Sequence, residues 1–372
     1  MTNKKAPSIR FKGFTDDWEQ RKLGDETIEM LAGGDIDKSR VVENGKYPIY
    51  ANALTNDGIV GYYDDYYRVK APAITVTGRG DVGHAQARTV DFTPVVRLLA
   101  IRSEHDAYFL ENAINNHGVI VESTGVPQLT VPQLGNYMIQ FPRTIEEETK
   151  IGDYFRNLDN LITLHQRECE RLQIVKKSML ENMFPKNGER VPKIRFSGFT
   201  DDWEKRKVGD ICFISTGKSN TQDKVDDGIY PFYVRSPIIE HSNKYLYDEE
   251  AVLTVGDGVG TGKVFHYVNG KYDLHQRVYR MFGFSEDVSA KYFYQWFSEK
   301  FYDRVMAMTA KTSVDSVRYE MIADMEIQLP TIVEQNEIAD FLFGLDNLIT
   351  LHQSKLEKLR LIKKTMLEQM FV

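Results

Sequence analysis

Nine residues of this chain, LDNLITLHQ, occur twice, at 158–166 and again at 345–353. Each copy lies inside a longer stretch with helical periodicity, 145–184 and 332–371, and each of these follows a segment of mixed composition. A long repeat that occurs only twice indicates an internal duplication rather than a solenoid of short repeats. We therefore expect two similar halves, each built from a mixed domain and a long helix.

A second repeated stretch precedes each mixed segment. Residues 7–19 return at 192–204 with two substitutions, and Gly13 and Gly198 mark a turn among aromatic side chains that can anchor it. The expected division of the chain is a lead-in at 1–20, a first domain at 21–143, a first helix at 144–184, a linker and repeated lead-in at 185–205, a second domain at 206–330 and a second helix at 331–372.

Apolar residues recur along both helical stretches in steps of three, four and seven, which places them on one stripe of each helix. Two long helices with matching stripes are expected to pair as a coiled coil. Pro185 and Gly188 end the first helix. The predicted fold is α+β: two similar mixed α/β domains joined by two long antiparallel helices, with an internal pseudo-two-fold relation.

In both mixed segments a β-branched strand precedes a glycine-rich loop, at 73–77 and 78–83 in the first and at 251–255 and 256–262 in the second. The remaining predicted elements of these segments are strands at 84–90, 95–101, 138–141 and 326–329, a helix at 107–114 capped by Asp106 and a helix at 292–297 capped by Ser289.

The motifs of catalysis are missing from the sequence. The glycines at 78, 80 and 83 fit a dinucleotide fingerprint by letter, but a strand rather than a helix is expected to follow them. Lys263 is followed by Val264, so the hydroxyl of a phosphate-binding loop is absent. The carboxylate runs at 64–65 and 248–250 are interpreted as solvated charges. These observations predict a chain without catalytic residues.

Charge and cysteine usage limit the class of protein further. The formal net charge is −7, which argues against a simple basic nucleic-acid binder, because phosphate neutralisation supplies most non-specific affinity. The two cysteines, Cys169 and Cys212, have no metal-ligand spacing and are interpreted as small buried apolar residues. No membrane span or secretory leader is recognisable, and we expect a cytoplasmic protein.

Recognition remains as the expected activity, with glycine loops that allow a ligand close to the backbone. Polar side chains on or beside loop-like stretches could contact base edges or phosphates. The candidate DNA-binding residues are Lys38, Arg40, Thr77, Arg79, His84, Lys218, Arg235, Lys263, His266, Arg277 and Lys311.

The order of motifs resembles one family. A lead-in FxGFTDDWE, a variable domain and an LDNLITLHQ helix that ends in KKxMLExMF (176–184 and 363–371) all occur twice. This layout is similar to the DNA-specificity subunit of type I restriction–modification systems, and the resemblance covers essentially the whole chain. The helical motifs are specific, whereas the two domains match only in their order of elements.

The resemblance implies that each domain recognises one half of a bipartite DNA target. It also implies that the helices set the spacing between the half-sites and dock two methyltransferase subunits, with two motor-nuclease subunits joining for cleavage. S-adenosylmethionine, ATP and Mg²⁺ would then be bound by the partner subunits, and this chain would bind no cofactor or metal. The candidates for helix pairing and partner binding are Leu158, Leu161, Ile162, His165, Leu172, Met179, Leu345, Leu348, Ile349, His352, Leu359 and Met366.

Two alternatives stay open at this point. One is a specificity subunit that serves methylation alone, without a nuclease partner. The other is a coiled-coil scaffold that carries two protein- or glycan-binding domains. Salt-sensitive, sequence-selective binding to duplex DNA in the presence of a methyltransferase partner would separate the scaffold from the specificity subunits.

Overall fold

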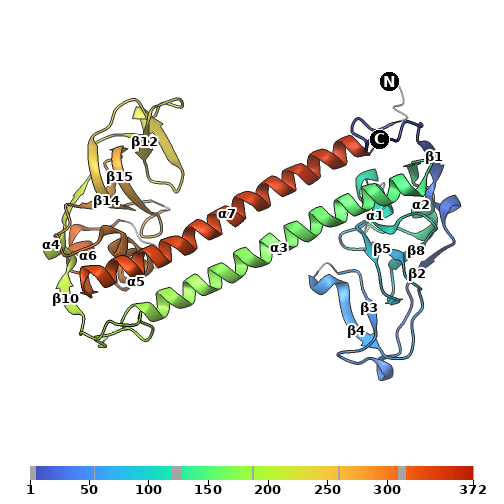
Figure 1. Ribbon diagram of the computed structural model, residues 1–372, viewed down its shortest axis with the longest axis horizontal. Helices are drawn as coiled ribbons and strands as arrows, with labels where there is room; N and C mark the ends of the chain where they lie inside the picture. Colours follow the sequence, from blue (N-terminus) through green and yellow to red (C-terminus); the bar gives the residue numbers. More distant parts are fainter. Residues whose placement is uncertain are drawn as a thin grey trace. The chain divides into compact units, whose positions relative to one another are not determined.

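The computed structural model describes residues 6–53, 55–118, 127–186, 188–258, 260–308 and 316–371. The chain divides into two compact units (Figure 1). Unit 1 comprises Met1–Arg167 and Gln353–Val372, and unit 2 comprises Glu168–His352. The boundaries fall inside the two long helices. Each unit therefore contains one mixed domain together with part of both helices, rather than domains and helices as separate bodies.

Unit 1 contains a four-stranded sheet in the order β2-β8-β5-β6, a three-stranded sheet β4-β3-β7 and the pair β1-β9. Its elements are β1 Glu19–Lys22, η1 Leu23–Glu26, β2 Glu29–Ala32, η2 Lys38–Arg40, β3 Tyr47–Tyr50, η3 Thr55–Gly58, β4 Ile59–Tyr63, β5 Ala73–Thr77, β6 Ala85–Arg88, β7 Thr93–Pro94, β8 Leu98–Arg102, α1 Ala107–His117, α2 Val131–Gly135 and β9 Met138–Phe141.

Unit 2 contains one six-stranded sheet in the order β11-β16-β14-β15-β12-β13 and the pair β10-β17. Its elements are β10 Glu204–Lys207, α4 Val208–Ile211, β11 Phe213–Thr216, η4 Thr221–Asp223, β12 Tyr230–Tyr233, β13 Ile239–Ser242, β14 Tyr247–Val255, β15 Phe265–Leu274, β16 Val278–Phe282, α5 Ala290–Met308, α6 Tyr319–Ala323 and β17 Glu326–Leu329.

The two long helices are α3 Ile145–Met183 and α7 Ile332–Met370, which confirms the predicted helices to within one residue. In both units α3 and α7 pack antiparallel. In unit 1, Lys363 Nζ lies 2.6 Å from Asp159 Oδ1, and in unit 2 Lys176 Nζ lies 2.5 Å from Asp346 Oδ1. The two ion pairs join the LDNLITLHQ motif of one helix to the terminal KK motif of the other.

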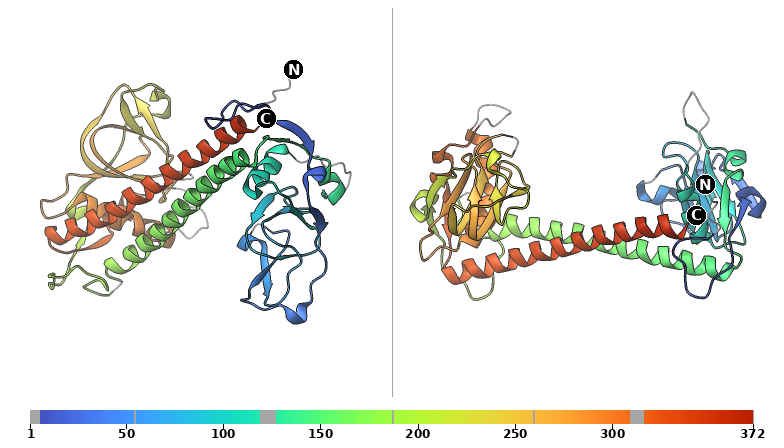
Figure 2. Two further views of the ribbon diagram at one scale, coloured as in Figure 1. Left: turned by 45° about the vertical axis from the view of Figure 1, so that its right-hand side comes forward. Right: turned by 90° about the horizontal axis from the view of Figure 1, so that it is seen from above.

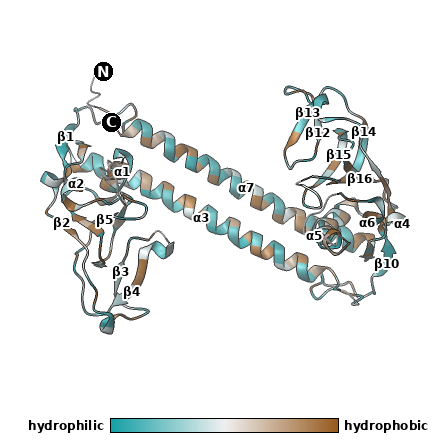
Figure 3. Cartoon of the chain, turned by 180° about the vertical axis from the view of Figure 1, so that it is seen from behind, coloured by the Kyte–Doolittle hydropathy of each residue, from teal (hydrophilic) through white to brown (hydrophobic). Residues whose placement is uncertain are grey.

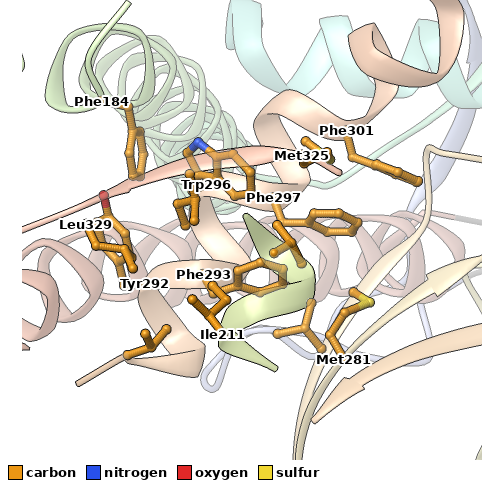
Figure 4. Packing of buried hydrophobic residues seen from close by; sticks show 14 of the residues in the cluster. Phe184, Ile211, Met281, Tyr292, Phe293, Trp296, Phe297, Phe301, Met325 and Leu329 are labelled. Carbon is orange, nitrogen blue, oxygen red and sulfur yellow. The ribbon is translucent and has the colours of Figure 1, made fainter. Parts of the chain in front are cut away.

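Apolar packing accompanies these ion pairs. Figure 3 shows hydrophobic and hydrophilic bands alternating along both helices. In unit 1 the C-terminal end of α7 lies against the first domain (Figure 2), and Phe371 stacks on Phe109 of α1 with ring centroids 5.5 Å apart. In unit 2 the end of α3 brings Phe184 against Tyr292, and Phe297 completes a buried aromatic cluster (Figure 4). Helix ends and domain cores are therefore packed as one body within each unit.

The repeated lead-ins join the helices to the domains. The guanidinium of Arg10 donates two hydrogen bonds to Glu147 of α3, at 2.5 and 2.8 Å. Arg195 makes the same pair of bonds to Glu334 of α7, at 2.7 and 2.8 Å. Both carboxylates are buried, so these duplicated ion pairs hold the start of each long helix against its lead-in.

Each lead-in also contacts the end of the other helix. The backbone N–H of Ile9 donates to Gln369 O at 3.1 Å, and that of Ile194 donates to Asn182 O at 2.9 Å. Gly13 and Gly198 adopt φ values of 104° and 100°, which confirms the predicted turns. The N-terminal lead-in thus takes the place beside the end of α7 that the second lead-in takes beside the end of α3.

Most predicted elements are present, with two instructive differences. The strand predicted at 95–101 begins only at Leu98, because Arg97 adopts φ +73° and Leu98 N donates back to Val95 O in a turn. The prediction of solvated carboxylates at 248–250 is wrong for Glu249, which is partly buried, whereas Asp248 and Glu250 are exposed as expected. Glu249 accepts a hydrogen bond from Tyr272 and pairs with Arg280, and Glu250 accepts one from Tyr267. These carboxylates link neighbouring strands.

Candidate nucleic-acid interface

Three loops of unit 1 meet at the ends of β3 and β5 and just before β8. The side chain of Asn52 ties them together: Oδ1 accepts from Gly78 N at 2.8 Å, and Nδ2 donates to Val96 O at 3.1 Å. The carbonyl of Gly78 accepts from Leu129 N at 2.9 Å. These bonds fix the loops relative to one another. The loop frame of unit 1 is defined as residues 51–52, 78–80 and 95–97.

Close backbone packing explains the residues of this frame. A Cβ atom at Gly78 would overlap the carbonyl oxygen of Arg97, so only glycine fits there without a shift of the backbone. Arg97 holds φ +73°, a conformation that non-glycine residues adopt rarely. The frame surrounds a hollow of about 520 Å³ whose lining residues are Ala51, Asn52, Arg79, Gly80, Val95, Val96, Arg97 and Pro127.

Unit 2 repeats the frame after β12, after β14 and before β16. Gly256 follows β14 as Gly78 follows β5; its N–H donates to Arg277 O at 2.8 Å, and its carbonyl accepts from Val317 N at 2.7 Å. A Cβ atom at Gly256 would lie 2.8 Å from Arg277 O. Arg235 takes the place of Asn52, because each follows the strand tyrosine by two residues. The loop frame of unit 2 is defined as residues 234–235, 256–258 and 275–277.

The two frames carry different charges. In unit 2, Asp257 lies 3.3 Å from Arg235 and 3.7 Å from Arg277. In unit 1 the corresponding positions are Asn52, Arg79 and Arg97, and no carboxylate within the described ranges forms an ion pair with either arginine. The guanidiniums of unit 1 are therefore exposed without a carboxylate partner in the described ranges, whereas those of unit 2 flank a carboxylate.

A buried histidine stabilises the loop frame of unit 2. His275 is buried, and its Nδ1 accepts from Arg277 N at 3.0 Å. Burial, followed by the nearby charges of Arg235 and Arg277, lowers the pKa of His275. The imidazole is therefore neutral at pH 7, which suits an Nδ1 that accepts a hydrogen bond.

The structure places the predicted DNA-binding residues in three groups. Thr77 is buried and its hydroxyl accepts from His84 N at 2.9 Å, so this residue supports the loop from within. His266 is half-buried beside Tyr233, and burial lowers its pKa, so it also points to the interior rather than to a loop surface. Lys311 lies outside the described residues. The exposed candidates are Lys38, Arg40, Arg79, His84, Lys218, Arg235, Lys263 and Arg277.

Only part of the exposed group belongs to the loop frames. Arg79 is in the first frame, and Arg235 and Arg277 are in the second. Arg40 instead pairs with Asp65 at 2.7 Å, and Lys263 lies over the Tyr302 ring.

Sequence reasoning missed Asn52, Arg97 and Asp257 as members of the frames. Arg97 falls within the strand that the sequence predicts at 95–101. The alignment of the two glycine loops could have identified Asp257 as the counterpart of Arg79.

The candidates on the long helices divide by exposure. Leu158 and Leu345 are buried, whereas Leu161 and Leu348 are 44% and 45% exposed. Partly buried residues that pack between helices and domains are Leu172, Met179, Leu359 and Met366, and the other partly buried candidates are Ile162, His165, Ile349 and His352. The buried leucines join the helices, and the exposed leucines form an apolar surface.

That apolar surface is duplicated. On α3 in unit 1, Leu164 is 54% exposed beside Leu161, and on α7 in unit 2, Leu351 is 49% exposed beside Leu348. These four leucines occupy matching places in the two LDNLITLHQ copies. They are named the leucine pairs. An apolar pair on a solvated helix, present twice with the same sequence, is typical of a surface that binds the same partner twice.

Within the described parts of the chain, no group of three or more His, Cys, Asp or Glu side chains could hold a metal ion. Over the same residues, every helix is too short or too polar to cross a bilayer. Cys169 and Cys212 are both buried, and burial raises the pKa of the Cys212 thiol to about 12.

Known proteins resemble this chain in sequence and in fold. Two curated relatives are the type I restriction enzyme MjaVIII specificity subunit of Methanocaldococcus jannaschii, 25% identical over 65% of this chain and 63% of that protein, and the EcoDI specificity subunit of Escherichia coli, 27% identical over 44% and 35%. The matches thus span less than two thirds of the length of these relatives. A crystal structure of the S subunit of a type I restriction–modification system from M. genitalium has the same fold, with a TM-score of 0.76, 13% identity and 99% of both chains covered.

The family assignment rests on both halves of the chain. The profile of the type I restriction modification DNA specificity domain matches residues 15–173 and again residues 200–361. Each match contains the end of one lead-in, one mixed domain and most of one long helix, which is nearly the whole unit of duplication found in the sequence and in the fold. The chain belongs to the type I restriction–modification DNA specificity domain family.

Proposed function

We propose that this chain is the specificity subunit of a type I restriction–modification complex and that each unit recognises one half of a bipartite duplex DNA target. The observation that carries this proposal is a contrast between surfaces. The loop frames are built from corresponding loops of the two units but carry Asn52, Arg79 and Arg97 in one unit and Arg235, Asp257 and Arg277 in the other. Two domains that recognise different half-sites require different side chains at corresponding positions, whereas two sites for one ligand do not.

The leucine pairs support the proposal that partners bind the helices. A surface that is repeated without change suits two copies of one partner, and we assign it to two methyltransferase subunits, with two motor-nuclease subunits joining for cleavage. The partners would carry the catalytic residues and the sites for S-adenosylmethionine, ATP and Mg²⁺, and this chain would supply recognition alone. They would also supply positive charge toward DNA, which the net charge of −7 makes necessary.

The helices are proposed to set the spacer between the half-sites. Each has 39 residues, which corresponds to about 58 Å at about 1.5 Å per residue. Their identical motifs are joined by the Lys176–Asp346 and Lys363–Asp159 ion pairs, so the register of the two helices is defined by charge as well as by apolar packing. A spacer that is fixed by the helices does not depend on which domain is attached.

One experiment tests recognition and spacing together. Residues 21–143 are replaced by the corresponding domain of another family member, and both proteins are combined with the methyltransferase partner and a randomised duplex DNA library. We expect the original chain to select a bipartite sequence. The exchanged chain should select a sequence with one new half-site, one retained half-site and the same spacer.

Three outcomes would contradict parts of the proposal. If both half-sites changed, the units would not be independent readers. A spacer that changed with the domain would exclude the helices as its determinant. Absence of any selected sequence, with the complex intact, would favour the coiled-coil scaffold. Addition of the nuclease subunits and ATP then separates a restriction system from one that only methylates, because only the first cleaves unmethylated DNA.

A further inference from the structure

We infer that the loop frames are the base-reading elements and that Arg97, with Arg79, makes unit 1 select a guanine-containing half-site. This inference rests on the proposed function and specifies it. The positions that determine specificity are 52, 79 and 97 in unit 1 and 235, 257 and 277 in unit 2. Asn52 acts as a positioning residue, because both ends of its amide already bind loop backbone.

The first step of the argument is rigidity. Base recognition by an arginine requires a guanidinium that is held in place, because a flexible cation can contact any phosphate. The frame of unit 1 supplies this support. Gly78 is held by Asn52 and Leu129, and Arg79 continues the same extended pairing through a bridge to Gln128. Both arginines therefore project from backbone that is fixed on each side.

The second step is the conformation of Arg97. Non-glycine residues rarely adopt the φ of +73° found at Arg97, because the Cβ atom then crowds the following carbonyl oxygen. Gly34, Asn52 and Gly78 surround the turn that contains it, and their contacts with 95–97 maintain that conformation. Arginine has no intrinsic preference for this region, so its presence is better explained by what its side chain contacts than by the turn itself.

The third step is charge. The Arg79 and Arg97 side chains both border the hollow of unit 1. Guanine presents two acceptors, O6 and N7, in the major groove, and arginine matches them with two parallel N–H donors. A frame with two guanidiniums and no bordering carboxylate is therefore suited to guanine.

In unit 2 the same three positions form an Arg–Asp–Arg group. Asp257 accepts a hydrogen bond from Arg235 and lies near Arg277. Its carboxylate therefore positions the two guanidiniums and offsets part of their positive charge. The second half-site should consequently depend on the carboxylate as well as on the arginines. Removal of this carboxylate alone would free two cations for phosphate contacts, which raises affinity for any sequence and steepens its salt dependence.

The experiment uses the full chain with its methyltransferase partner and the randomised duplex library. Arg97→Lys and Arg79→Lys keep the positive charge but lose the planar guanidinium with its two parallel N–H donors. We expect one or both to reduce the preference for guanine at one position of one half-site by about tenfold or more, with binding to unrelated duplex changed less than twofold. Asp257→Asn should alter the other half-site only and should strengthen binding to unrelated duplex at low salt. Arg143→Lys, an exposed arginine outside the frames, is the matched control and should change neither half-site.

The outcomes separate this inference from the function on which it rests. If the unmodified chain selects no bipartite sequence, the proposed function fails and the inference fails with it. If it selects one and both arginine variants select the same bases with the same preference, the function stands and the inference is overturned. A uniform loss of affinity with unchanged base preference also overturns it, because that result assigns the arginines to phosphates.

Discussion

In unit 1, β6 and β7 are two short strands that belong to separate sheets, whereas in unit 2 the single strand β15 spans both positions and joins the strands on either side of it into one six-stranded sheet. The parallel pairing is nevertheless the same: Tyr50 is opposite Pro94, and Tyr233 is opposite Leu274. Strand continuity can thus change between the copies without moving the loops that follow β3 and β12. The comparison teaches that the loop frames depend on local register rather than on the extent of the sheet.

The connections between helix and domain differ much less than the sheets. Arg10–Glu147 and Arg195–Glu334 have the same geometry, and Trp18 and Trp203 are both buried against an aromatic residue of the following domain. Where the copies must attach to the same helix pair, residues are retained. Where they face solvent near the loop frames, residues differ. This division agrees with common docking and separate recognition.

The largest expected effect tests the equivalence of the two attachments. Arg195→Ala leaves Glu334 buried and unpaired, which should destabilise unit 2 by about 3–5 kcal/mol, and Arg10→Ala should destabilise unit 1 by the same amount. Denaturant unfolding of the full chain, followed by hydrogen exchange to locate the change, measures both effects. The control is Arg190→Ala, whose pair with Asp202 is exposed and should contribute less than about 1 kcal/mol. Clearly unequal losses of stability in the two units would show that the two attachments are not equivalent.

The sequence predicts the duplication, the long helices and the strand–glycine order because each depends on local periodicity or on residues close together in the chain. It does not predict Arg10–Glu147, since the partners are far apart and the repeated arginine has no local partner. Even the nine-residue repeat gave no sign that Asp159 pairs with Lys363. Both partners are repeated, but the antiparallel pairing joins one copy to the other.

The candidate site could be predicted only in part for a related reason. A glycine loop is visible in the sequence, and so were Arg79 and Arg277. The frames, however, are assembled from three loops each, and the positions of Asn52 and Asp257 follow from hydrogen bonds across those loops. His266 was misplaced because alternation along β15 turns it inward, beside Tyr233. Loop contacts between distant segments carry no periodic signal.

A second prediction sharpens the comparison of the loop frames. Gly78→Ala would force a Cβ atom into the carbonyl of Arg97, while Gly256→Ala would place it 2.8 Å from Arg277 O. We expect a cost of about 2–3 kcal/mol in unit 1 and a smaller cost in unit 2, measured by thermal unfolding. Gly80→Ala is the control, because its added Cβ would meet no atom within 4 Å and only the positive φ of +80° opposes it, at about 1–2 kcal/mol. Equal costs at 78 and 256 would mean that the first frame relaxes more readily than its hydrogen bonds indicate.

The smallest expected effect concerns an attachment that differs between the units. In unit 1, Glu148 accepts from Asp106 N and lies 2.8 Å from His105 Nδ1, and Glu26 lies 2.9 Å from His105 Nε2. Unit 2 has Gln335 in the place of Glu148, and its amide accepts from Ser289 N and donates to backbone carbonyls. The first attachment can titrate, and the second cannot.

Burial opposes ionisation of His105, but its hydrogen bonds with Glu148 and Glu26 outweigh burial and raise the pKa of this imidazole. A raised pKa in the folded state means that the stabilisation is fully present below the unfolded pKa, about 6.5, and is lost as pH rises through the folded pKa. Unit 1 should therefore lose protection against hydrogen exchange at the start of α1 as pH rises from below about 6.5 through the raised pKa of His105, after correction for the intrinsic exchange rate. The start of α5 should not. Glu148→Gln leaves the pair of His105 with Glu26 in place, so it should weaken this pH dependence and cost about 1 kcal/mol at pH 6; a pH response unchanged by the substitution would show that the His105–Glu148 contact does not supply it.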